Sequence, residues 1–283
     1  MEANIDRGFV RIQEGQVHFR LAGDLASRRP LVLVHASPSS SLNLLSLMRK
    51  LAGTRPLFAP DTLGHGDSAA AAMEVPDIVY YAGALGRVLD TLGVGEIDIY
   101  GTHTGASIAS ELAIAQPERV HRLVIDGIGL FTGEEQADFL ANYAPAIQPD
   151  ALGSHLNWAW QFVRDQAVFF PWYRRDAEHS RAEGMPPTKV LHDIVVEVLK
   201  AINTYHHAYR AAFSHSKRER LPLVSVPTLV MGEASDPLSP TQNEVCALLP
   251  AGELADLSHT PDGVTAAKAA AIIEFIDRDQ VLD

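Results

Sequence analysis

The sequence predicts an α/β protein, with a mostly parallel sheet, helices on both faces and one helical insert. Short runs rich in β-branched and apolar residues alternate with helix-like stretches over the first 129 residues. This alternation stops at residue 130 and returns at residue 222. We therefore expect residues 1–129 and 222–283 to form one core, with residues 130–221 inserted as helices.

Composition supports a folded protein and narrows its partners. The 283 residues are 47% hydrophobic, and 23 Lys+Arg against 35 Asp+Glu give a formal charge of −12. An acidic chain without a basic run lacks the charge pattern that binds nucleic acid or an anionic membrane. A small-molecule substrate is therefore the expected partner, and either a monomer or a homodimer is compatible with the sequence.

The sequence also suggests a cellular location. No run approaches the roughly 18 apolar residues of a membrane span, and the segment 1–7 does not resemble a signal peptide. Cys246 is the only cysteine, which excludes an internal disulfide and a thiolate metal cluster, and its apolar helical neighbourhood favours a core position. We expect a cytoplasmic protein.

About eight strands are expected. The first two are separated by Gln13-Glu14-Gly15, which predicts a leading hairpin. The expected strands are Phe9–Ile12, Gln16–Leu21, Leu31–His35, Leu57–Ala59, Ile97–Tyr100, Arg122–Asp126, Pro227–Gly232 and Glu253–Leu257.

Helices are expected between and after these strands. Ser39 and Ser40 can cap a helix that runs to Leu51, Gly93 ends the helix after Asp77, and Pro117 ends another at Gln116. The later helices are expected at Glu134–Tyr143, His155–Phe170, Thr188–Phe213, Pro240–Leu249 and Val264–Arg278.

The segment Gly101-Thr102-His103-Thr104-Gly105 joins a strand to a helix and is the most informative part of the sequence. Two glycines flank one large side chain with only threonines between them. Such a turn forces its central residue into a strained conformation and projects the side chain above the sheet edge. By itself, the pattern is also compatible with an ordinary turn that contains a histidine.

This turn resembles the G-x-S-x-G nucleophile elbow of the α/β-hydrolase fold superfamily, and the resemblance covers nearly the whole chain. The segments 34–38, 61–68 and 232–237 resemble the family's oxyanion loop, its D-x-x-G-x-G-x-S segment and its acid-bearing strand end. The resemblance implies an inserted helical cap at residues 130–221. It also implies an acid at Asp236, with Asp126 as the alternative position, and a basic histidine at His259.

The sequence departs from the family because His103 stands where the nucleophilic Ser, Asp or Cys is expected. We expect the helix N-terminus to lower the pKa of His103 and leave a neutral imidazole. A neutral imidazole can act as a nucleophile or as a general base. The favoured hypothesis is hydrolysis of a small ester, lactone or related carbonyl compound, aromatic or carboxylate-bearing, with His259 and Asp236 assisting. The backbone N–H groups of Ser37 and Thr104 would form the oxyanion hole.

Four alternatives stand beside this hypothesis. The same groups could support a lyase or C–C bond-cleaving reaction, or the scaffold could only bind a ligand. The Ser37 hydroxyl could replace the missing nucleophile, although a capping or contact role fits it better. His35, His103 and His259 could hold zinc, but the short spacings of metal motifs are absent, so we expect no metal and no organic cofactor.

Substrate-binding residues are harder to infer. His35 follows a predicted strand, and the insert is rich in aromatic, Arg and His side chains. We expect His35, Arg164, Trp172 and His206 to contact a flat or anionic substrate. Most of the other aromatic residues of the insert, including Tyr205 and Tyr209, have the helical spacing of core positions.

Overall fold

The computed structural model describes residues 4–182, 184–257 and 263–278. Its eight-stranded sheet has the order β1-β2-β4-β3-β5-β6-β7-β8. The two pairs that involve β2 are antiparallel and the other neighbouring pairs are parallel, which confirms the predicted fold class. The strands are β1 (Asp6–Ile12), β2 (Gly15–Ala22), β3 (Leu31–Val34), β4 (Leu57–Pro60), β5 (Ile97–Thr102), β6 (Val120–Asp126), β7 (Thr228–Met231) and β8 (Gly252–Leu254).

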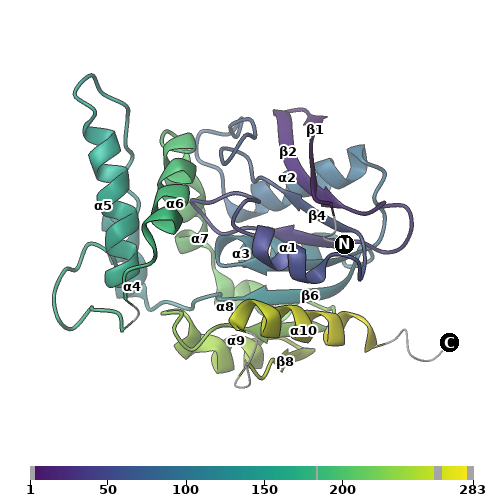
Figure 1. The fold of residues 1–283 in the computed structure, drawn as a ribbon. Coiled ribbons are helices and arrows are strands. Elements are labelled where there is room, and N and C mark those ends of the chain that lie inside the picture. The colour runs from purple at the N-terminus through teal and green to yellow at the C-terminus, as the bar shows by residue number, and fades with distance from the viewer. Residues whose placement is uncertain (1–3, 183, 258–262, 279–283) are drawn as a thin grey trace.

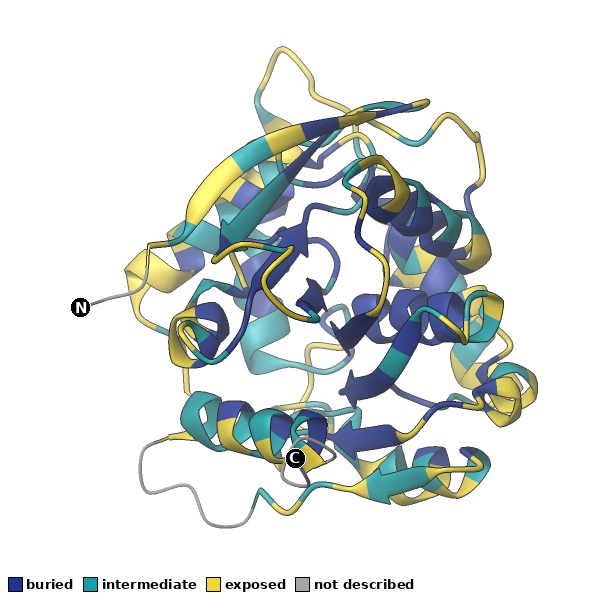
Figure 2. Ribbon diagram, turned by 90° about the vertical axis from the view of Figure 1, so that its right-hand side faces the viewer, coloured by how far each residue is buried: buried dark blue, intermediate teal, exposed yellow. Residues whose placement is uncertain are grey.

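Helices cover both faces of the sheet, as Figure 1 shows. Successive side chains of β3 alternate between the faces: Val32 packs in one apolar cluster and Leu33 in the other. The Val32 face is covered by α2 (Ile78–Thr91), α3 (Thr104–Ala115) and α9 (Gln242–Leu248), and the Leu33 face by α1 (Leu45–Leu51) and α10 (Val264–Ile276). The central strands are therefore buried on both sides (Figure 2).

Between β6 and β7 the described residues form helices and no strand of the sheet. They are α4 (Gly133–Asn142), α5 (Ser154–Val168), α6 (Thr188–Lys200), α7 (Tyr205–Ser214) and α8 (Lys217–Arg220). Helices α4, α5 and α6 stand beside one end of the sheet in Figure 1. They share an apolar cluster with α7, built around Phe162, Trp172 and Tyr205, that is separate from the two clusters of the sheet.

Two local predictions were wrong. The single helix expected over Thr188–Phe213 is two helices, because the Thr204 hydroxyl in the turn between them donates to the carbonyl oxygen of Gly64 at 2.5 Å. Helix α1 has no side-chain cap. The Ser40 hydroxyl instead donates to the buried carboxylate of Glu197. In both places a long-range contact overrides the local pattern.

The register of the parallel strands places the site residues at one edge. Val34 pairs with Gly101, Thr102 with Asp126, and Asp126 with Met231. The segments that leave β3, β5, β6 and β7 therefore emerge side by side at the carboxyl edge, where open α/β sheets bind ligands. Among the described residues, no helix has the length and apolar character needed to cross a bilayer.

Candidate active site

His103 occupies the turn between β5 and α3 in a strained conformation, with φ 51° and ψ −110°. The turn is tight because a Cβ at Gly101 would lie 2.2 Å from the Gly105 oxygen, and one at Gly105 would lie 2.2 Å from the Val34 oxygen. Neither position tolerates a side chain. The strand and helix hold His103 at the base of a cavity, where 42% of its side chain is accessible.

Asp236, in the loop after β7, is the partner of His103. Its Oδ2 lies 2.7 Å from His103 Nε2, and its Oδ1 accepts a hydrogen bond from the Leu238 N–H at 2.9 Å. Because an ionised carboxylate can only accept, Nε2 carries the proton that is donated to Asp236. Nδ1 is consequently the basic nitrogen of the neutral ring.

The prediction that the pKa of His103 is lowered was wrong. Desolvation does lower this pKa, but the hydrogen bond and charge of Asp236, with a further contribution from Asp126, raise it above its usual value. For the acid Asp236 burial acts in the opposite direction and favours a higher pKa. The charge of His103 and the hydrogen bonds from His103 and the Leu238 N–H nevertheless hold the pKa of Asp236 below its usual value. A carboxylate in direct contact outweighs the positive end of helix α3.

Asp126 ends β6, next to the dyad, and has different partners. Its Oδ2 accepts from the Tyr100 hydroxyl at 2.5 Å and from Lys268 Nζ at 2.7 Å. Lys268 also pairs with Glu233 at 2.8 Å, and both carboxylates help to raise its pKa although burial acts in the opposite direction. The charge of Asp126 is thus balanced by Lys268 at the floor of the cavity, whereas Asp236 contacts His103 directly.

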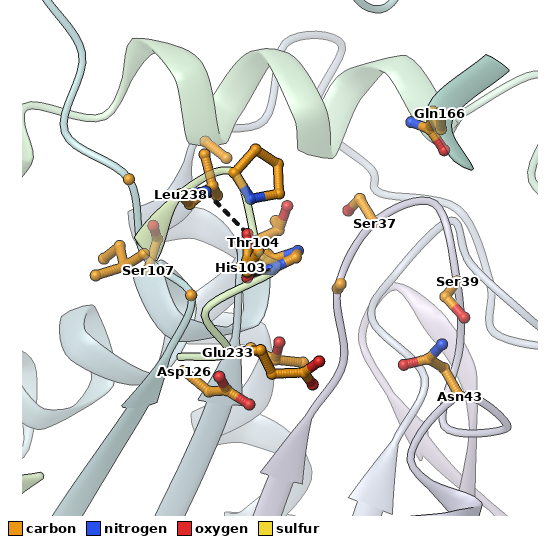
Figure 3. Close-up of a pocket in the computed structure, with 18 of the residues that line it drawn as sticks. Ser37, Ser39, Asn43, His103, Thr104, Ser107, Asp126, Gln166, Glu233 and Leu238 are labelled. Atoms are coloured by element: carbon orange, nitrogen blue, oxygen red, sulfur yellow. Dashed lines mark hydrogen bonds and ion pairs between the residues drawn. The ribbon is translucent and has the colours of Figure 1, made fainter. Parts of the chain in front are cut away.

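The predicted oxyanion donors line the same cavity. Ser37 follows β3, and Thr104 is the first residue of α3 (Figure 3). The N–H groups of the first helical turn have no partner within the helix, so the Thr104 N–H can serve a ligand.

A cavity of about 540 Å³ opens above His103. Such a volume suits a small molecule. Its floor comes from the carboxyl edge of the sheet, and the helical region contributes a wall in which half of the residues are aromatic. The wall residues from this region are Phe131, Tyr143, Gln166, Phe170, Arg181, Ile194, Tyr209, Ala212, Phe213 and Lys217.

The four predicted substrate-binding residues lie elsewhere, and none is among the residues that line this cavity. His35 is buried and braces two loops, since its Nδ1 contacts the Ala36 oxygen at 2.8 Å and its Nε2 accepts from the Thr62 N–H at 2.9 Å. That geometry puts the proton on Nδ1, and burial lowers the pKa of His35.

The other three belong to the packing of the helical region. Arg164 pairs with its buried neighbour Asp165. Trp172 Nε1 donates to the Tyr143 oxygen at 2.9 Å. His206 packs against the His207 ring, with 4.2 Å between centroids, and burial lowers its pKa to about 4.

His259 falls outside the described residues, so its predicted role stays a prediction. Among the described residues, one cluster could hold a cation, namely His18, Asp61 and Asp67. However, Asp61 already accepts hydrogen bonds from His18 and from the Ser41 and Asp67 N–H groups. These hydrogen bonds give the cluster a structural role, because they hold the loop that contains Asp61 and Asp67.

Sequence reasoning missed several polar groups of the cavity: Gln166, Arg181, Lys217, Glu233 and Lys268. Glu233 stands beside the predicted acid and could have been considered. Lys217 belongs to a charged run that is typical of a solvated surface, and Lys268 is a single cation among the alanines of α10.

Comparisons with known proteins agree with the fold. A family model of the alpha/beta hydrolase fold matches residues 29–254, so the chain belongs to this family. It is 39% identical over 124 residues to a 2-hydroxymuconate semialdehyde hydrolase of Pseudomonas sp. (strain CF600), covering 42% of this chain and 44% of that protein. It is 29% identical over 134 residues to a 2-hydroxy-6-oxo-2,4-heptadienoate hydrolase of Pseudomonas putida F1, covering 44% and 47%. The chain thus matches less than half the length of each of these curated relatives.

Solved structures share the architecture at low identity. An alpha/beta hydrolase enzyme from a Medee basin deep-sea metagenome library has a TM-score of 0.74 at 18% identity, covering 96% of this chain and 98% of that one. The enol-lactonase from Burkholderia xenovorans LB400 has a TM-score of 0.67 at 16% identity, covering 96% and 100%. These similarities extend over the helical region as well as the sheet.

Proposed function

We propose that the protein is a cofactor-independent hydrolase of small carbonyl compounds, such as esters or lactones, and that His103 and Asp236 act as its general-base dyad. The observation that carries the proposal is the 2.7 Å contact between these two side chains at the base of the cavity. Membership of the alpha/beta hydrolase fold family supports it. Two relatives are also named as hydrolases of a semialdehyde and of an oxo compound, both of which contain a carbonyl group.

In the proposed reaction, His103 Nδ1 takes a proton from a water molecule as that water attacks the substrate carbonyl. Asp236 keeps the proton of the ring on Nε2 and stabilises the imidazolium that forms. The oxyanion accepts hydrogen bonds from the Ser37 and Thr104 N–H groups, each worth roughly 3 kcal/mol of barrier. His103 then returns the proton to the leaving group, and His259 is a second candidate for this step.

The helical region supplies the remaining requirement, a partly enclosed site. Residues 130–221 would act as a cap whose aromatic side chains bind the apolar part of the substrate and reduce its contact with water. Tyr143, Phe170 and Tyr209 are suited to a flat substrate because they present rings to the cavity.

A panel of aryl esters and lactones tests the proposal. His103→Ala should lower kcat/KM about 1000-fold. His192→Ala removes an exposed histidine of α6 and should leave turnover unchanged. Unchanged turnover in His103→Ala would refute the role of His103.

Intact-mass analysis during turnover separates a general base from a nucleophile. A general base leaves the mass of the protein unchanged, whereas a nucleophilic His103 gives an acyl-imidazole adduct. An adduct on His103 would replace the base mechanism and keep the hydrolase assignment.

A further inference from the structure

Lys217, at the start of α8, is a buried cation on the cavity wall. Its residue exposure is 7%, and its Nζ donates one hydrogen bond, to the Ala212 oxygen at 2.6 Å. Nζ also lies 5.2 Å from the centre of the Phe131 ring. Ala212 and Phe131 line the cavity too, so the ammonium group is at its edge.

Lys217 has fewer partners than Lys268 and Arg181, two other cations that line the cavity. Lys268 is paired with Asp126 and Glu233, and Arg181 donates to the backbone oxygens of Gln166 and Ser235. Among the described residues, no carboxylate lies within ion-pair distance of Lys217 Nζ. Glu111 of α3, which contacts α8, is instead bound by Arg220 and His215.

Burying an ammonium group without a counterion is unfavourable. Burial lowers the pKa of Lys217 to about 8, which still leaves the side chain mostly charged at pH 7. An ammonium carries three protons, and the Ala212 oxygen accepts one of them. The remaining donors suit an anionic ligand that enters the cavity.

A short stretch of chain, from Gly127 to Phe131, links the surroundings of His103 to those of this cation. Gly127 lies against the His103 ring, since a Cβ there would be 2.4 Å from His103 Cδ2. Phe131, which contacts Lys217, is four residues further along. Four residues span at most about 14 Å. Because His103 and Lys217 also line the same cavity of about 540 Å³, one small molecule can contact both.

We propose that Lys217 binds a carboxylate of the substrate, so that the enzyme acts on carbonyl compounds carrying a negative charge at the end remote from the reacting group. This inference rests on the proposed function for the reaction, but binding of the anion does not require turnover. In this proposal Lys217 takes the anion-binding role that the sequence analysis expected of Arg164 and His206.

Calorimetric titration with benzoate and with benzamide tests the binding. The wild-type protein should bind benzoate at least about tenfold more tightly at pH 7, because a charge-assisted hydrogen bond distinguishes the two ligands. Lys217→Met should abolish the preference. Lys189→Met is the matched control, since it removes the same charge from an exposed site on α6 and should keep the preference. Equal wild-type affinity for the two ligands, or a preference that survives Lys217→Met, would overturn the inference.

Two further measurements separate the possible failures. The melting temperature of Lys217→Met should equal or exceed that of the wild type if the buried charge serves a ligand, and should fall if Lys217 serves only to hold the Ala212 oxygen.

Phenyl hydrogen succinate should have at least a tenfold higher kcat/KM than phenyl butanoate. In Lys217→Met this advantage should be lost through a higher KM for the succinate ester. Benzoate preference without hydrolysis of either ester would refute the proposed function and keep the anion site. Hydrolysis of both esters at equal rates without benzoate preference would refute the anion site and keep the proposed function.

Discussion

Two aspartates near the ends of neighbouring strands have different partners: Asp126 ends β6, and Asp236 lies in the loop after β7. Asp236 contacts the imidazole of His103, whereas Asp126 contacts Lys268 and the Tyr100 hydroxyl. Both carboxylates raise the pKa of His103, but only Asp236 bonds to its ring. The comparison teaches that the bonded partner, rather than proximity to the cavity, assigns a carboxylate its chemical role.

The largest expected effect is the contrast between Asp236→Asn and Asp126→Asn. The two substitutions are isosteric and remove one charge each. Asp236→Asn should lower kcat about 1000-fold because the amide no longer fixes the tautomer of His103 or stabilises its charge. Asp126→Asn should lower kcat less than about tenfold. Equal losses in ester hydrolysis would remove the distinction between the two aspartates.

The pH profile sharpens the same contrast. A general base works in its unprotonated form, so kcat/KM of the wild type should rise with pH through the pKa of His103, above 6.5. In Asp236→Asn the hydrogen bond and charge that do most to raise the pKa of His103 are lost, while desolvation, which lowers it, remains. The acidic limb should therefore move to lower pH, and a limb that stays in place would indicate another base.

Gly127 lies against both His103 and Asp236, and its substitution should cause the next largest loss of kcat. It has a φ of 68°, and an added Cβ would lie 2.4 Å from His103 Cδ2 and 2.6 Å from Asp236 Oδ2. Gly127→Ala should lower kcat about 100-fold by displacing the imidazole. Gly93→Ala is the control, because its φ of 67° imposes the same backbone strain with nothing within 4 Å. If both variants hydrolyse the ester equally, the contact with His103 does not matter.

Lys268 should matter for stability more than for chemistry. Lys268→Met leaves the buried Asp126 without its cation and should lower the free energy of unfolding by about 2 kcal/mol. Denaturant titration at pH 7 measures the loss. Combining it with Asp126→Asn should recover part of the stability, and a simple sum of the two losses would show that the pair is not coupled.

Ser37→Ala should have the smallest effect. The proposed donor is the backbone N–H, which the substitution retains, so kcat/KM for the aryl ester should change less than about threefold. A loss near 1000-fold would identify the Ser37 hydroxyl as a nucleophile.

The sequence predicts much of this arrangement because local signals set it. The glycines at 101 and 105 mark a turn that only small residues allow, and each of the eight expected strands has a counterpart in the sheet. Parallel strands then bring Asp126 and the segment around Asp236 to the edge that holds His103. Residues adjacent to strand ends could be predicted for this reason.

What the sequence did not predict depends on long-range geometry. The direction of the pKa shift of His103 follows from a 2.7 Å contact across 133 positions. Lys217 belongs to the run Lys217-Arg218-Glu219-Arg220, which is typical of a solvated surface, but α8 packs it against Phe131. Arg164 was expected in the site, yet its neighbour Asp165 is buried and binds it.

The central claim is that Asp236 fixes the protonation of His103, and NMR titration of the His103 ring measures this directly. In the wild type, the ring should carry its proton on Nε2 when neutral and titrate above 6.5. In Asp236→Asn its pKa should fall. A wild-type ring that titrates at or below 6.5, or that carries its neutral-state proton on Nδ1, would contradict the account.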